Sequence, residues 1–269
     1  MMRDWLFMGG IAFAAVTVTQ MGLQTVNAKA DGALVDDFAD FTCAVNPLGI
    51  SADTSAHVFG NVSLQYSSFA GKLVAGKAVA VEHSRFGTAI VNDASFAEAP
   101  SNMIKSDLQL SAISPTLSGV TKALDSLNVR GQQSVAPAGG EREELFFYGQ
   151  NAVLNVFSMN SASFETARTL SVEGVPGATT LIIVNGEDVT LKAMAMRVQG
   201  INPEGVIFYF PTAKIIRASS MNFKGTVLAP HAVFEVNEVV LAGQVVVQTL
   251  RGRLDIRQIA FKGCIPAGT

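Results

Sequence analysis

Alternating arginines near the end of the chain are the residues best suited to bind a ligand. In the segment LRGRLDIRQ, residues 250–258, every second position is charged, namely Arg251, Arg253, Asp255 and Arg257. A strand points alternate side chains to opposite faces, so this spacing predicts one charged face. Because the guanidinium fork matches carboxylate and sulfate groups, we predict that Arg251, Arg253 and Arg257 bind an anionic polymer. The alternative is a solvated strand face on which Asp255 relieves the repulsion between the arginines.

Other polar residues form no recognisable catalytic or metal-binding pattern. None of the three histidines, His57, His83 and His231, has a second histidine or a cysteine at the spacing of a zinc site. We expect His231 to lie in an exposed turn. No phosphate-binding or dinucleotide-binding glycine motif follows a predicted strand. The sequence therefore predicts no metal, no cofactor and no enzymatic activity. A glycan-cleaving enzyme, which would need two acidic groups in one groove, is the enzymatic alternative.

The first thirty residues are typical of a secretory signal peptide. Arg3 precedes an apolar run over residues 5–18, and the motif AKA at residues 28–30 supplies small residues at a cleavage position. A membrane anchor is the alternative, but the run is shorter than the roughly 20 residues that a spanning helix needs. We predict a signal peptide over residues 1–30, a single mature domain over residues 31–269, and no transmembrane segment after cleavage. The domain is then exported to the extracellular space, the cell surface or the periplasm.

Two cysteines, Cys43 and Cys264, stand near the two ends of the mature domain. An even number of cysteines in an exported protein favours a disulfide, whereas metal binding would need more ligands than two distant thiols. We therefore predict a bond that locks both ends of one domain together. In the chain-entropy model, closing so long a loop stabilises the folded state by roughly 5 kcal/mol.

The composition allows a large core and limits the partners. With 49% apolar and 15% charged residues, the 269-residue chain can bury an extensive core. The formal net charge of −3 excludes nucleic acid as a general partner, because a phosphate-binding surface needs a strong basic excess. Asp36, Asp37 and Asp40 lack the alternating ligand pattern of a calcium loop, and we predict a short amphipathic helix with an acidic face there.

Short strand signals dominate the rest of the chain. Alternating or continuous apolar segments, most of them ended by Gly, Pro or Asn, predict strands over residues 57–91 and 145–261. Between them, residues 101–131 carry apolar positions at helical spacing, which predicts one helix or two helices parted at Pro115. Residues 132–144 are expected to form a polar loop. Because no helices alternate with the strands, a doubly wound sheet is not expected.

Two distant stretches of the sequence repeat one another. SFAGKLVAGKAV from Ser68 and NFKGTVLAPHAV from Asn222 match at Phe69/Phe223, Gly71/Gly225, Ala75/Ala229, Ala78/Ala232 and Val79/Val233. Glycine also recurs at Gly87, 16 residues after Gly71, and at Gly243, 18 residues after Gly225. Such a period fits stacked β-coils, each of which needs a neighbour to bury its apolar face. The pattern favours a mainly β solenoid over its rival, a β-sandwich.

These motifs also resemble a known family. HVFGNVSLQYSSF, LNVFSMN, VPGATTLIIVNG, GTVLAPHAV and AGQVVV are similar to the motifs of the choice-of-anchor A domain family, and the match covers roughly His57 to Phe261. The resemblance implies an exported adhesive module and a right-handed β-solenoid, with one long helix or helix pair packed alongside as in ice-binding β-solenoids. It supplies no catalytic residues. YFP stands at residues 209–211 where the family has N-F-P, and GCIPAGT is followed by no anchor, which leaves surface attachment open.

Together these observations predict a non-enzymatic adhesive module that contacts an extracellular polymer, glycan or matrix protein. The alternative is a structural component of an extracellular layer that binds copies of itself. Ice binding is a third hypothesis, because of the resemblance. Flat ice-binding faces usually carry ranks of Thr, one per coil, whereas Thr88, Thr226 and Thr249 occur singly.

Overall fold

The computed structural model describes most of the predicted mature domain. The described residues are 43–44, 47–50, 52–91, 103–105, 110–127, 132–137 and 143–266. Residues Gly32–Thr269 form one compact unit. The predicted signal peptide over residues 1–30 lies outside the described residues, as do the aspartates of the predicted acidic helix.

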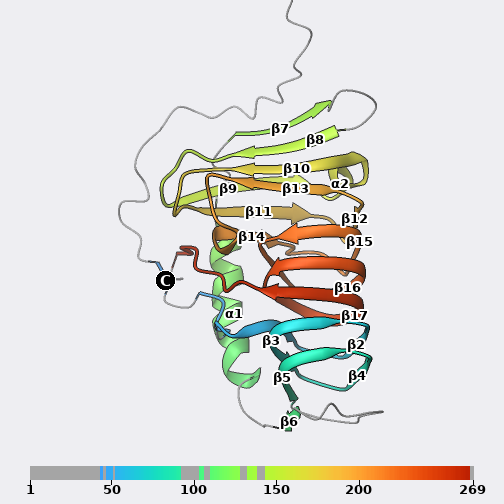
Figure 1. Ribbon diagram of the computed structural model, residues 1–269. Coiled ribbons are helices and arrows are strands. Elements are labelled where there is room, and N and C mark those ends of the chain that lie inside the picture. Colours follow the sequence, from blue (N-terminus) through green and yellow to red (C-terminus); the bar gives the residue numbers. More distant parts are fainter. Residues whose placement is uncertain are drawn as a thin grey trace, which may run out of the picture. The chain divides into compact units, whose positions relative to one another are not determined.

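The domain consists mainly of short and long strands (Figure 1). The first part of the chain forms β1 (Thr54–Val58), β2 (Val62–Gln65), β3 (Ser68–Ala75), β4 (Val79–Glu82), β5 (Arg85–Val91) and β6 (Met103–Lys105). The middle part forms α1 (Leu110–Asp125), β7 (Gln132–Pro137), β8 (Glu143–Tyr148), β9 (Leu154–Asn160), α2 (Ala162–Thr166), β10 (Ala167–Glu173), β11 (Thr179–Asn185) and β12 (Asp188–Lys192). The last part forms β13 (Ala195–Gln199), the 3-10 helix η1 (Pro203–Gly205), β14 (Val206–Tyr209), β15 (Ile215–Lys224), β16 (Thr226–Gly243) and β17 (Val245–Gln258).

The strands stack into coils with three faces. Face A has the spatial order β6-β5-β3-β1-β17-β16-β14-β11-β9. Face B contains β12, β15, β16, β17, β2 and β4, paired in that order. Face C joins the ends of β15, β16 and β17 to the beginnings of β3 and β5. Long strands such as β16 bend at corners and contribute to all three faces, so the predicted solenoid architecture is found. Its right-handed winding stays a prediction.

Stacked interior rows explain the sequence repeat. Phe223, Leu241, Ile256, Phe69 and Phe86 pair in register along face C. All five side chains are buried, and the rings of Phe69 and Phe86 pack edge to face at 5.1 Å. The predicted match of Phe69 with Phe223 therefore places both residues in one row. Each such side chain removed from water contributes roughly 1.5–3 kcal/mol.

The repeated glycines lie where successive coils approach closely. Gly225 has a φ of +119°, and a Cβ there would lie 2.9 Å from the carbonyl oxygen of Val206. A Cβ at Gly243 would collide with the carbonyl oxygen of Gly225 in the adjacent coil. Glycine is required at these corners because any side chain would push the coils apart.

The spatial order of the coils differs from their order in the sequence. The first described strand, β1, pairs with the last, β17, through Ala56–Val245, His57–Val246 and Val58–Val247. Two buried hydrogen bonds join the same coils: Gln244 Nε2 donates to the Thr54 carbonyl at 2.8 Å, and the Leu254 amide donates to Ser67 Oγ at 3.0 Å. We call this contact between the first and last coils the seam. The C-terminal coil therefore lies inside the stack.

The predicted disulfide is confirmed, and it lies beside the beginning of β11, where the Cys264 amide donates to Thr179 Oγ1. Cys43 and Cys264 are bonded with their Cα atoms 5.0 Å apart, although 221 residues separate them in the sequence. Next to the bond, Cys43 forms an antiparallel bridge with Pro266, and the Ala44 amide donates to the Ile265 carbonyl at 2.9 Å. Both ends of the described domain are thus held together.

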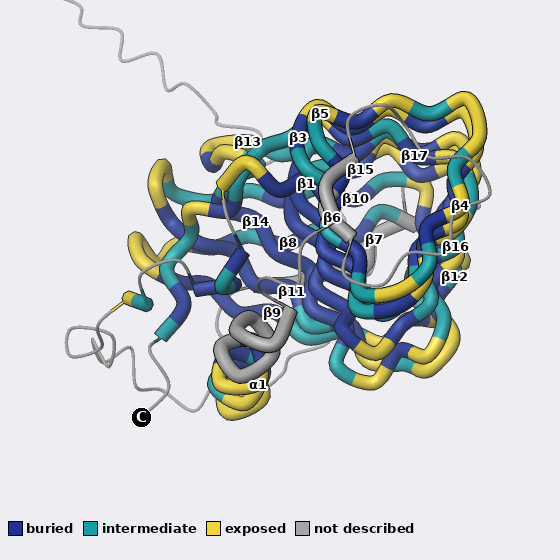
Figure 2. Tube along the Cα trace, turned by 90° about the horizontal axis from the view of Figure 1, so that it is seen from below, coloured by how far each residue is buried: buried dark blue, intermediate teal, exposed yellow. Residues whose placement is uncertain are grey.

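Helix α1 packs against the outside of face A (Figure 2). Leu117, Val120 and Leu124 are buried in one cluster with face A residues, among them Tyr209 and Val246. The chain forms one helix that runs through Pro115, rather than two helices parted there. It has 16 residues, so the long helix implied by the resemblance is not shown. None of the described helices is long and apolar enough to cross a membrane.

One local prediction is wrong. The segment expected as a polar loop over residues 132–144 contains β7, which pairs antiparallel with β8. Strand β7 extends the sheet β13-β10-β8-β7 and satisfies the free edge of β8. Tertiary pairing therefore overrides the polar composition that suggested a loop.

A hydrogen bond ties α1 to face A, and its loss should weaken the helix docking. The Tyr209 hydroxyl donates to Asp125 Oδ1 at 2.9 Å, and burial together with this carboxylate raises the tyrosine pKa. We expect Tyr209→Phe to lower the free energy of unfolding by about 1 kcal/mol, measured by urea denaturation. In a double-mutant cycle, Asp125→Asn should lower the free energy of unfolding much less in the Tyr209→Phe background than in the wild type. Full additivity of the two losses would contradict a direct bond.

Candidate ligand-binding face

A corner at Gly252 divides the predicted arginine strip. The alternation along β17 is as expected, since Leu250, Leu254 and Ile256 are buried. However, residues 250–252 pair with β2, whereas residues 255–256 pair with β3. The chain turns sharply between them at Gly252, which has a φ of +113°. A Cβ at this position would collide with the Val236 carbonyl, so the turn requires glycine.

The three predicted arginines therefore do not share one face. Arg251 lies on face B, in register with Ser63 and Glu235. Arg253 lies at the corner, where its Nη1 is 3.4 Å from Glu238 Oε1. Arg257 lies on face C opposite Ala242. Period-two spacing predicted the exposure of these side chains correctly and missed the corner.

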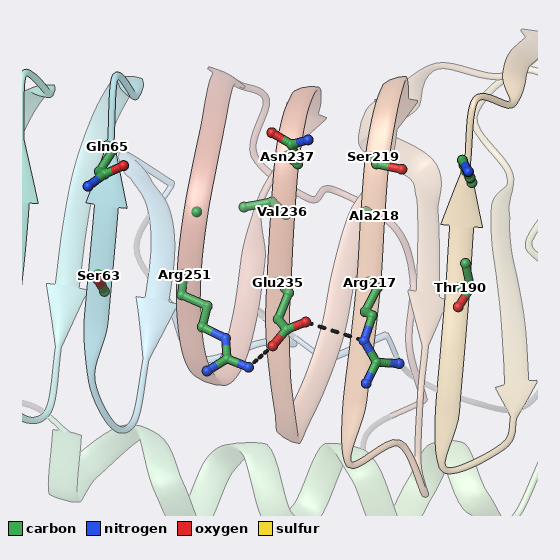
Figure 3. Close-up of a pocket in the computed structure, with 12 residues that line it drawn as sticks. Ser63, Gln65, Thr190, Arg217, Ala218, Ser219, Glu235, Val236, Asn237 and Arg251 are labelled. Atoms are coloured by element: carbon green, nitrogen blue, oxygen red, sulfur yellow. Dashed lines mark ion pairs between the residues drawn. The ribbon is translucent and has the colours of Figure 1, made fainter.

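Face B instead brings Arg251 together with charged residues of other coils. Thr190, Arg217, Glu235, Arg251 and Ser63 follow one another in register on adjacent strands, and we call them row 1. Arg217 Nε lies 3.3 Å from Glu235 Oε2, and Arg251 is ion-paired with the same carboxylate (Figure 3). Arg217 also pairs with Asp188. The three central residues of row 1 thus alternate in charge across the strands.

A second row of polar side chains runs parallel to row 1. Lys192, Ser219 and Asn237 follow in register on β12, β15 and β16, and Gln65 continues on β2; we call these four row 2. Strand β17 contributes no side chain to row 2, because Gly252 stands opposite Val236 and the register shifts before Val239 and Leu254. Row 2 therefore has a gap over Gly252.

The two rows border a shallow groove of about 620 Å³. Its floor is formed by Ala218, Val236 and Gly252, of which the first two direct their side chains into the core. In the view of Figure 3, one side of the floor is bordered by Gln65, Asn237 and Ser219, which lie toward the top. The other side is bordered by Ser63, Arg251, Glu235, Arg217 and Thr190, which lie toward the bottom. The groove crosses the strands, so it follows the direction in which coils are stacked.

The corner that borders row 2 is conformationally unusual. Among the described residues, the non-glycine residues with positive φ all lie at the turn from face B to face C, one per coil: Tyr66, His83, Ala193, Ser220 and Glu238. The rings of Tyr66 and His83 stack at 5.0 Å, and both side chains are exposed. A left-handed residue lets the chain turn sharply, at a cost of roughly 1–2 kcal/mol each.

The histidines occupy three unrelated environments. His231 is exposed at the bend of β16 between faces A and B, in agreement with the predicted turn. His57 is fully buried on β1, between Val246 and Val74, and neither ring nitrogen has a hydrogen-bond partner. Burial lowers its pKa from 6.5 to about 4, so the ring is neutral at pH 7. No group of three or more metal-ligating side chains occurs among the described residues.

Glycan cleavage and ice binding each require a particular pattern of side chains. Among the described residues that line the groove, Glu235 is the one carboxylate, whereas glycoside hydrolysis uses a pair. Thr88, Thr226 and Thr249 pair with Lys72, Ile207 and Val233 respectively, so they do not stack into a common row. Thr226 is also fully buried.

The sequence prediction missed Arg217 and Glu235, although a signal for them exists. Arg217 and Glu235 are 18 residues apart, the same interval as Gly225 and Gly243. Because each side chain stands the same distance before its glycine, aligning Gly225 with Gly243 would also have aligned Arg217 with Glu235. The strip on β17 was conspicuous because its charges alternate within one short segment of the sequence.

This arrangement defines a parallel β-solenoid with a grooved polar face. The chain belongs to the family described as "Putative Ice-binding-like adhesive domain", whose model matches residues 11–258. The predicted kinship with an adhesive domain is confirmed, while the narrower choice-of-anchor A assignment stays a prediction.

Two of the solved structures to which the chain is similar are ice-binding proteins. The crystal structure of an ice-binding protein from an Antarctic bacterium, Flavobacteriaceae, has 14% identity and a TM-score of 0.44 and covers 83% of this chain. This chain spans 50% of the length of that structure. A glycosylated ice-binding protein from an Arctic yeast has 14% identity and a TM-score of 0.40, covering 80% of this chain and 94% of its own. No curated protein sequence matches.

Proposed function

We propose that the protein is an exported, non-enzymatic adhesive module that contacts a polymer or matrix ligand outside the cytoplasm. Membership of an adhesive-domain family supports the binding role. The Cys43–Cys264 disulfide supports export, because such bonds persist in oxidising compartments. The extracellular space and the cell surface are the proposed locations, with the periplasm as the alternative.

The observation that carries the proposal is the groove on face B. Its polar side chains come from five adjacent strands, of which β15, β16, β17 and β2 are held by parallel ladders on both sides and β12 by a ladder with β15. Such a surface is pre-organised, so a ligand that spans several coils orders few side chains on binding. A rigid row of repeated contacts suits an extended polymer better than a compact small molecule.

A non-enzymatic role agrees with the charged side chains of the groove. Glu235 is ion-paired with two arginines and is the one carboxylate among the described residues that line the groove, whereas glycoside hydrolysis uses a pair. The groove therefore favours binding over hydrolysis.

Binding of the purified chain to an array of glycans and matrix proteins tests this proposal. We expect selective and saturable retention by one class of ligand, with a single monomeric species by light scattering at the same concentration. Concentration-dependent assembly without retention would instead support the alternative, a structural component that binds copies of itself.

A further inference from the structure

We propose that the groove on face B binds an anionic polysaccharide along the direction of coil stacking, with Arg217, Arg251 and Lys192 as its cationic contacts. This inference rests on the proposed adhesive function and names its ligand class and site. It replaces the strip along β17 by a site that crosses the strands, because Arg253 and Arg257 lie outside the groove.

The charge of the groove favours an anionic ligand. Three cations, Lys192, Arg217 and Arg251, line it together with one carboxylate, Glu235, a surplus of two positive charges. The whole chain carries a net charge of −3, so this local surplus runs against the average. Asp188 pairs with Arg217 from outside the lining and reduces the surplus without cancelling it.

The two arginines retain donors for a ligand. A guanidinium has five N–H donors, and Arg217 uses Nε and Nη1 while Arg251 uses Nη2 for carboxylates of the protein. Both side chains are about half exposed, at 46% and 54%. Glu235 competes for both guanidinium groups, and the remaining N–H groups of each can still donate to a carboxylate or sulfate group of a ligand.

The spacing suits a ligand with repeated charges. Arg217 and Arg251 stand on β15 and β17 with β16 between them, so their backbones are roughly 10 Å apart. A linear polymer that carries an acidic group at regular intervals can place one group at each fork. Lys192, across the groove on β12, extends the cationic contacts by one more coil.

The remaining lining favours a sugar over a peptide. Row 2 offers the hydroxyl of Ser219, the amide of Asn237 and the amide oxygen of Gln65, whose Nε2 donates to Glu82, and such groups pair with hydroxyl groups. A peptide is usually held by a free sheet edge or by apolar pockets for its side chains. The groove lies across the middle of face B, where β15, β16 and β17 already pair with strands on both sides.

Two matched double variants test the site. The full chain is passed over immobilised polygalacturonate, dextran sulfate and neutral dextran at increasing salt. We expect retention on at least one of the anionic supports and none on dextran. Arg217→Ala with Arg251→Ala should weaken the binding at least tenfold, because two charge-assisted contacts are lost. Arg253→Ala with Arg257→Ala removes the same charge outside the groove, and this variant should change the binding less than twofold.

A third variant separates binding from a merely structural role. Glu235→Gln removes the internal competitor and should strengthen retention several-fold, whereas a loss of fold would weaken it. Thermal unfolding of all variants should stay near that of the wild type, since exposed ion pairs contribute little. Carboxylated and sulfated supports distinguish the two anionic groups.

The outcomes distinguish this inference from the proposed function. Equal losses in the two double variants would overturn the groove as the site. Retention only by a neutral glycan or a matrix protein would overturn the ligand class and leave the adhesive function standing. Failure to bind any ligand on the array, with self-assembly, would overturn both.

Discussion

A chain carrying Cys43→Ser and Cys264→Ser is expected to lose about 5 kcal/mol of its free energy of unfolding, an upper value from the chain-entropy model. The bond joins residues 221 positions apart, so its removal restores a large conformational entropy to the unfolded chain. Equilibrium urea unfolding of the wild type and the variant measures the difference. A loss of this size is comparable with the whole stability of many domains.

The structure indicates where the weakened protein opens first. Cys264 precedes Ile265 and follows Phe261, and both apolar residues pack in the cluster under α1 with Leu48 and Ile50. Without the disulfide, the segments around Cys43 and Cys264 are held only by noncovalent contacts. Amide exchange should therefore accelerate first in β1 and in residues 259–266. Reductant should lower the stability of the wild type and leave the serine variant unchanged, and equal urea midpoints for both chains would contradict the prediction.

Acid is expected to destabilise the protein through His57. Its pKa falls from 6.5 to about 4 on burial, so between these values the unfolded chain binds a proton that the folded chain does not. The folded state is then fully stabilised above about pH 6.5 and loses stability as the pH falls toward 4. The total loss from this group is about 3 kcal/mol, most of it complete by pH 4.5.

Comparison with a variant isolates this contribution from that of other acidic groups. His57→Leu removes the buried ring nitrogens, which have no hydrogen-bond partner, so it should be at least as stable as the wild type at pH 7.5. At pH 4.5 its advantage should grow by about 2.5 kcal/mol, measured by urea unfolding. The exposed histidines provide the control, and His83→Gln with His231→Gln should keep the wild-type pH dependence. A parallel pH profile for His57→Leu would refute the assignment.

Features that depend on local spacing could be predicted from the sequence. The shared positions Phe69 and Phe223 indicated a stack of coils because a solenoid uses the same environment once per coil. The apolar face of α1 was visible in Leu117, Val120 and Leu124 for the same kind of reason. The two cysteines predicted the closure of the domain without its geometry.

Features that depend on spatial order could not be predicted in this way. Nothing in the strands themselves specifies that β1 pairs with β17, because any coil with an apolar interior can stack on any other. The groove could not be predicted for the same reason, because Arg251 comes close to Glu235 and Arg217 only when the coils are stacked in register. His57 gave no signal, because its neighbours Val74 and Val246 come from other coils.

The disulfide closure also determines how the domain carries a mechanical load. Residues 43 and 264 are joined covalently, so tension applied between the two ends of the chain passes through one sulfur–sulfur bond. The residues between Cys43 and Cys264 bear none of this tension. Tension between the chain ends therefore does not separate the strands. Only a force between one chain end and a ligand held on face B would load the stacked coils, and it would do so across their hydrogen-bond ladders.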